Sequence, residues 1–173
     1  MAKKIPVFMS VGQTHTESQR MYLETLVAYL NSCGISAETL GRTFWSIKTP
    51  LVPVRRKMQE VYGAAILAME RFHSKEGISK EGSPYETVVD SRYFATVWTH
   101  IEAAMAYQLD LPLLILKERK LVAEGMFDPA INEWLIIQID IEDPDEIRRK
   151  PIKAFVDTWI EDVRRCYYSR TTR

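Results

Sequence analysis

The stretch Ala64-Ala65-Ile66-Leu67-Ala68-Met69 is wholly apolar and lies between a glycine and a glutamate. Uninterrupted apolar runs of this length are typical of a parallel strand buried on both faces of a sheet. Residues 5–9 form a second compact run of the same kind. Pro6 is acceptable in it, because proline is tolerated at the start of a strand. Together these two runs predict the centre of a parallel sheet.

Three further strands are predicted, at residues 35–40, 113–116 and 135–139, and helical segments separate all five. The first helix begins at Thr14 or Thr16, since both have capping-box spacing to a later Glu or Gln. Others begin at Thr49-Pro50 and at Pro151, where proline fits the first turn. A further helix is predicted to begin near Phe94. Its expected inner face consists of Phe94, Trp98, Ile101, Met105 and Leu109.

Strands that alternate with helices imply right-handed crossovers and a parallel sheet covered on both sides. The sequence therefore predicts one α/β domain over residues 1–173, with a doubly wound, flavodoxin-like five-stranded parallel sheet and helices on both faces. Residues 71–92 interrupt the pattern with two glycines, a proline and no apolar periodicity. They are predicted to form a long loop insertion, and a lid, a docking surface and a disordered segment all remain open for it.

Composition sets limits on the partners. Lys plus Arg and Asp plus Glu both total 23, so neither capture of nucleic acid nor adhesion to an anionic membrane is expected. Cys33 and Cys166 lie far apart without metal-ligand spacing, and no metal site is expected. No run approaches the roughly 20 apolar residues of a membrane span. No secretory signal precedes the first strand, and we expect a cytoplasmic protein.

Ligands of doubly wound sheets bind outside the carboxyl ends of the strands. The loop after the first strand offers Ser10, Gly12 and Gln13 ahead of a helix N-terminus, which suits a phosphate or a ribose hydroxyl. Its spacing is neither G-x-G-x-x-G nor that of a P-loop, which disfavours a classical dinucleotide fold and an NTPase. A simple capped turn is the alternative interpretation.

Trp98 and Glu102 are four residues apart and share one helical face. A carboxylate at the margin of an apolar stripe is partly desolvated, which suits a nucleophile, a base or a stabiliser of a sugar cation. The alternative is a surface glutamate beside a core tryptophan. His100 is not expected to be a partner of Glu102, because residues so close along a helix point apart.

Several of these motifs resemble known families. Val7-Phe8-Met9-Ser10, Trp98-x-x-x-Glu102 and the apolar run after Pro112 resemble elements of Toll/interleukin-1 receptor (TIR) domains. The run that starts at Glu102 also resembles the Glu-x-Gly-x-Ala segment of nucleoside 2-deoxyribosyltransferases, with alanine in place of glycine. The resemblance covers about residues 5–117. Two features depart from it: the long 71–92 insertion, and Asp90-Ser91, which lies about eleven residues before Glu102.

Both resemblances imply a catalytic role for Glu102. They imply cleavage of an N-glycosidic bond of NAD or a related nucleotide, with Glu102 stabilising an oxocarbenium-like sugar. NAD would then be a substrate or ligand, and no cofactor is expected. The expected binding groups are Ser10, Gly12 and Gln13 for ribose or phosphate, Phe8, Phe44 or Trp98 for stacking on a ring, and Arg42 and Arg71 for the pyrophosphate.

A second class of function stays open, because fold does not fix function. The domain can instead be a non-catalytic nucleotide-sensing or assembly domain that uses the same pocket. The family analogy further implies self-association as a homo-oligomer or a protein partner, and a place in bacterial antiviral defence. A receiver-like phosphorylation domain is disfavoured, because Ser10 and Glu70 occupy positions where that class needs acidic residues.

Overall fold

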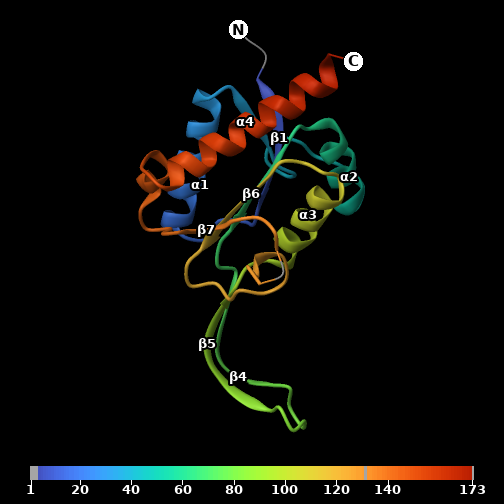
Figure 1. Cartoon of the computed structure of the whole chain (residues 1–173). Coiled ribbons are helices and arrows are strands. Elements are labelled where there is room, and N and C mark those ends of the chain that lie inside the picture. Colours follow the sequence, from blue (N-terminus) through green and yellow to red (C-terminus); the bar gives the residue numbers. More distant parts are fainter. Residues whose placement is uncertain (1–3, 131, 173) are drawn as a thin grey trace.

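A computed structural model describes residues 4–130 and 132–172. Its main sheet has five parallel strands in the order β2-β1-β3-β6-β7 (Figure 1). This is the flavodoxin-like order, so the predicted α/β class and doubly wound sheet are confirmed. The strands are β1 (Ile5–Val11), β2 (Ile35–Glu38), β3 (Ala64–Ala68), β6 (Leu113–Glu118) and β7 (Ile136–Ile139).

Helices cover both faces of this sheet. α1 (Glu17–Ser32) and α4 (Ile152–Thr171) pack on one face, and α2 (Leu51–Glu60) and α3 (Val97–Gln108) pack on the other. Two short 3₁₀ helices, η1 (Gly125–Phe127) and η2 (Pro144–Arg148), lie in the later connections. β3 is buried along its whole length, as its apolar sequence predicted, because it lies at the centre of the sheet between two helical layers.

The helix starts follow local capping. α1 begins at Glu17, and the Thr16 side chain accepts a hydrogen bond from the Gln19 N–H, so Thr16 and not Thr14 is the N-cap. α2 begins directly after Thr49-Pro50, and α4 begins directly after Pro151. No helix in residues 4–130 and 132–172 is long and apolar enough to cross a bilayer.

The insertion at 71–92 is not an irregular loop, which corrects the prediction. It forms an antiparallel hairpin of β4 (Phe72–Ser79) and β5 (Thr87–Phe94). This hairpin, which we call the arm, projects from the carboxyl-end edge of the main sheet, opposite the start of β1 and the end of α4 (Figure 1). The apolar alternation expected of a strand is missing because, beyond Tyr93 at its base, neither face of the arm packs on a core.

The predicted helix near Phe94 begins three residues later, since Phe94 is the last residue of β5. Its predicted inner face is also wrong in part. The buried residues of α3 are Thr99, Ala103 and Ala106, whereas Trp98 and Ile101 remain 37% and 38% exposed. Small side chains let the helix axis lie close to β1 and β3, and the larger residues are displaced to its flanks.

Candidate active site

A hydrogen bond joins the end of β1 to α3. Ser10 is buried on β1, and its hydroxyl donates to the carboxylate Oε2 of Glu102. Burial raises the pKa of Glu102 to about 7, and the hydrogen bond from Ser10 opposes this rise by favouring the ionised form. Glu102 is therefore a desolvated carboxyl group that changes charge near neutral pH, and a surface glutamate is excluded.

Glu102 lies at a cavity of about 320 Å³. Its walls come from the end of β1 and the loop that follows it, the loop after β2, the residue that precedes β4, and the N-cap and first two turns of α3. The lining residues are Val11, Gly12, Gln13, Leu40, Pro50, Arg71, Thr96, Trp98, Thr99 and Glu102. β1 and β3 both end here, so the cavity occupies the carboxyl-end position at which doubly wound sheets bind ligands.

Most of the predicted site residues meet at this cavity. Gly12, Gln13, Arg71 and Trp98 line it together with Glu102. Around the carboxyl group they place the open backbone of the glycine, the side-chain amide of the glutamine, the guanidinium of the arginine and the partly exposed indole of the tryptophan. Ser10 does not line the cavity and instead contacts Glu102 from beneath. The observed contact of Ser10 is therefore with Glu102 and not with the cavity.

Three predicted contacts do not reach the cavity. Phe8 is 1% exposed and belongs to the core under α2, so no ligand ring can stack on it. The Phe44 ring packs 6.5 Å from that of Phe8, with Lys57 over it. Arg42 is exposed in the turn after β2 and is not part of the lining. Phe8 lies on the same face of β1 as Ser10. It is two residues farther from the carboxyl end of the strand, where α2 covers it.

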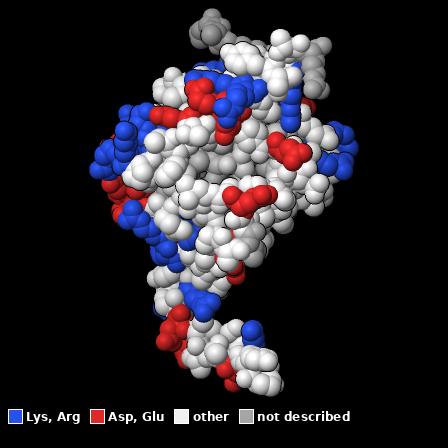
Figure 2. All heavy atoms as spheres, viewed as in Figure 1, with Lys and Arg blue, Asp and Glu red and all other residues white. Residues whose placement is uncertain are grey.

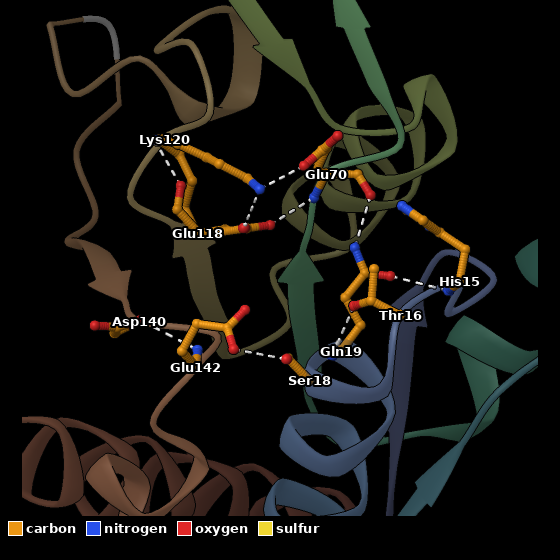
Figure 3. Close-up of polar contacts among 10 residues, drawn as sticks. His15, Thr16, Ser18, Gln19, Glu70, Glu118, Lys120, Asp140 and Glu142 are labelled. Atoms are coloured by element: carbon orange, nitrogen blue, oxygen red, sulfur yellow. Dashed lines mark hydrogen bonds and ion pairs between the residues drawn. The ribbon is translucent and has the colours of Figure 1, made fainter.

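Side-chain hydrogen bonds hold the N-terminus of α1 against the neighbouring loop. Thr16 accepts from the Gln19 N–H, and the Gln19 side-chain oxygen accepts from the His15 N–H at 3.0 Å. The Gln19 amide then donates to the Glu70 carbonyl at 2.9 Å, which fastens the loop to the end of β3 (Figure 3). The predicted phosphate site therefore reduces to Gly12 and Gln13, because the helix terminus itself is capped and does not line the cavity.

A polar cluster at the ends of β3 and β6 stabilises the neighbouring loops. Glu118 accepts a 2.7 Å hydrogen bond from the Glu70 N–H, and Lys120 forms ion pairs with both carboxylates (Figure 3). Buried Lys117 donates to the Leu121 carbonyl at 2.6 Å. These groups are matched with partners inside the domain, so we assign the cluster to structure and not to catalysis.

His100 points to the opposite side of α3 from Glu102, as predicted. It lines a larger, mainly apolar cavity of about 880 Å³ between α3 and residues 124–126 and 132–134. Its ring lies 4.1 Å from that of Phe127, and burial lowers its pKa. The face of the molecule in Figure 2 carries a broad area above the arm that is mostly uncharged and is interrupted by acidic side chains. Glu124 and Glu133 in this larger cavity are exposed, so it has no desolvated carboxylate comparable to Glu102.

Sequence reasoning missed two threonines of the site. Thr96 is the N-cap of α3 and Thr99 is buried beside Glu102, with its hydroxyl donating to the Thr96 carbonyl at 2.6 Å. A threonine just before the helical pattern is a capping signal that could have located Thr96. Asp90-Ser91 lies in the arm, where the Ser91 hydroxyl is 2.9 Å from His73 Nε2, and takes no part in the cavity.

Comparison of the chain with protein-family models, with curated proteins and with solved structures finds no match. Within residues 4–130 and 132–172, no group of three or more His, Cys, Asp or Glu side chains is placed to hold a metal ion. The chemistry of the site therefore has to be inferred from the geometry around Glu102.

Proposed function

We propose that this domain cleaves the N-glycosidic bond of NAD or a related nucleotide, with Glu102 stabilising the sugar as it becomes cationic. The observation that carries the proposal is the carboxyl group of Glu102, desolvated at a cavity at the carboxyl ends of β1 and β3. The resemblance of this sequence to two families that act on N-glycosidic bonds also supports a catalytic role for Glu102.

One carboxylate suffices for this chemistry when the leaving group is nicotinamide. The electrons of the breaking C–N bond neutralise the positively charged ring, so the base needs little acid catalysis to depart. Positive charge develops instead on the anomeric carbon and ring oxygen, where a nearby carboxylate stabilises it in a site with little water. Water then adds to the anomeric carbon and loses its proton to Glu102 or to solvent, or a second hydroxyl adds in a transfer reaction.

The other lining residues provide orientation. The Gln13 amide and the backbone at Gly12 suit ribose hydroxyls or a phosphate oxygen, and the Trp98 ring suits stacking on a base. Arg71 is exposed where it joins the lining, and its guanidinium suits the pyrophosphate. At about 320 Å³ the cavity is small for a ligand site. We therefore place one nucleoside half inside it and the other across Arg71.

The alternative is a nucleotide sensor that binds without turnover. The pKa near 7 supports this alternative, because part of the Glu102 population is then protonated at neutral pH. That state can donate a hydrogen bond to a ligand but cannot stabilise a sugar cation. Binding and bond cleavage therefore have to be measured separately.

The test is incubation of the protein with NAD, with NADP and with purine and pyrimidine nucleosides, followed by chromatographic detection of the free base. Wild type should release a base from at least one of them, and Glu102→Gln should lower the rate by about 100-fold or more. Glu124→Gln is the matched control, because Glu124 is an exposed glutamate at the larger cavity. Binding without release would favour the sensor, and undiminished release by Glu102→Gln would refute the proposal.

A further inference from the structure

One face of the arm carries its side chains in an ordered series of cross-strand rows. Residues that pair directly across an antiparallel ladder point to the same side, and alternate pairs share a face. Outward from the base, the rows of this face are the ring row (Phe72, Phe94), the basic row (Ser74, Arg92), the acidic row (Glu76, Asp90) and the aliphatic row (Ile78, Val88). We call this side the paired-row face.

The paired-row face is open to solvent although it is rich in apolar groups. Phe72 is 62% exposed, Ile78 52% and Val88 70%. Figure 1 shows the arm extending away from the domain, and among the described residues no helix or strand packs along it. A two-stranded hairpin without a covering layer is only marginally stable in water. The arm is therefore a segment whose structure gains from a partner.

The acidic row points to the charge of that partner. Glu76 and Asp90 are direct cross-strand neighbours, and like charges in that position destabilise a hairpin. A cation placed over the row would reverse this effect. The basic row supplies such a cation in Arg92, one row nearer the base. Arg92 is exposed, so a second molecule can reach it.

The order of the rows is self-complementary. When two arms are stacked face to face and antiparallel about a two-fold axis, the ring row of each meets the aliphatic row of the other. The basic row of each then meets the acidic row of the other. Every apolar row is covered by an apolar row, and each Arg92 faces two carboxylates. An isologous interface requires this kind of pattern, in which one patch matches itself.

The opposite face of the arm lacks such an order. His73 and Tyr93 are stacked there at 4.1 Å, with Lys120 of the main domain over the Tyr93 ring. Beyond them this face carries Lys75, then Gly77 and Val89, and then Ser79 and Thr87. Its base is thus occupied by the domain itself, and its outer part has only one large apolar side chain.

We propose that the paired-row face of the arm binds the same face of a second copy of this chain, as an antiparallel two-fold pair. The four rows span six residue steps, or about 20 Å of strand. Two strands of that length offer much less area than the roughly 800 Å² per partner of a standard interface. The dimer is therefore weak and concentration-dependent, with specificity supplied by Arg92 and the acidic row.

The test is sedimentation velocity of the full chain over a range of concentrations. Wild type should form dimers as concentration rises. Arg92→Glu should weaken association by about tenfold or more, because it places a carboxylate over the partner's acidic row. Lys75→Glu is the matched control: it reverses the charge of a neighbouring exposed residue on the opposite face of the same strand, and it should dimerise as wild type does.

A charge exchange separates this arrangement from any other interface. The double variant Glu76→Lys, Asp90→Lys should also fail to self-associate, because the two lysines of one copy would face Arg92 of the other copy. Mixed with Arg92→Glu, it should form a heterodimer about as tight as the wild-type dimer, because both contacts then join opposite charges. A wild type that stays monomeric would overturn the proposal, as would dimers of Arg92→Glu equal to wild type or a mixture that does not associate. If wild type is monomeric, the partner of the paired-row face would have to be a different protein.

Discussion

Replacing Glu102 by glutamine should stabilise the folded domain at pH 8 and have little effect at pH 4.5. The ordinary pKa of the carboxyl group is 4.5, and burial raises it to about 7 in the folded domain. Between these values the folded state binds more protons than the unfolded state. Stability contributed by this group is therefore full below about pH 4.5 and is lost as pH rises toward 7.

The size of the effect follows from the two pKa values. They differ by about 2.5, and each pH unit corresponds to about 1.4 kcal/mol, so ionising Glu102 in the folded domain costs about 3 kcal/mol. This is an upper limit, because one side of the carboxyl group faces an open cavity. A glutamine at this position keeps a side-chain oxygen that can accept the hydrogen bond from Ser10 and carries no charge. It should therefore recover about 2–3 kcal/mol at pH 8.

Urea unfolding followed by circular dichroism measures this difference at pH 4.5, 6, 7 and 8, since the midpoint reports stability when the slope is unchanged. Glu124→Gln is the control, because an exposed carboxyl group should give no such trend. A stabilisation by Glu102→Gln that does not grow with pH would refute the assignment of a desolvated carboxyl group, as would a loss of stability at pH 8. A stabilisation that grows with pH would show that Glu102 lowers the stability of the folded domain, as residues kept for function often do.

Four further outcomes are expected. Base release should rise with pH through about 7, because the ionised form of Glu102 is the active one; a kcat/KM profile that is flat from pH 5.5 to 8.5 would contradict this. Ser10→Ala removes a hydrogen bond that lowers the pKa of Glu102, so the midpoint of that profile should move to higher pH, which the same assay detects. Arg71→Gln should raise KM for a dinucleotide with little change in kcat, because the proposed contact of Arg71 is with the pyrophosphate and not with the reacting carbon; steady-state kinetics would show an equal fall in kcat if this is wrong. The N–H of Arg71, a residue of the cavity, also donates to the Phe94 carbonyl at the base of the arm, which links the arm to the site. Arg92→Glu, which weakens dimerisation, should therefore lower base release at concentrations at which wild type dimerises; equal rates of base release at every concentration would show that the arm does not affect the site.

The layered architecture could be predicted from sequence because burial on both faces leaves a clear record. β3 lies under helices on both sides, and its sequence is apolar throughout. The arm follows the opposite rule. Beyond Tyr93 at its base, neither of its faces meets a core, so nothing forces an apolar residue at every second position, and glycine and proline in its sequence resemble a loop. Secondary structure that packs on nothing within its own chain cannot be predicted from hydrophobic periodicity.

The desolvation of Glu102 could be predicted from the sequence, but several of its neighbours could not. Glu102 lies at the margin of an apolar helical stripe, where a carboxyl group is partly removed from water. The contacts of Phe8 and Phe44 depend on where α2 crosses the sheet, a tertiary feature that local sequence does not encode. The inner face of α3 was misjudged for a related reason, since close packing on a sheet favours alanine and threonine over larger apolar residues.

The central claim is that the carboxyl group of Glu102 acts on the anomeric carbon of a bound nucleotide. The most direct measurement is a crystal structure of Glu102→Gln with intact NAD. The account predicts the anomeric carbon about 3–3.5 Å from a side-chain atom of the residue at position 102, with a phosphate at Arg71. A nucleotide bound in the larger cavity on the other side of α3, or a sugar held out of reach of that side chain, would contradict it.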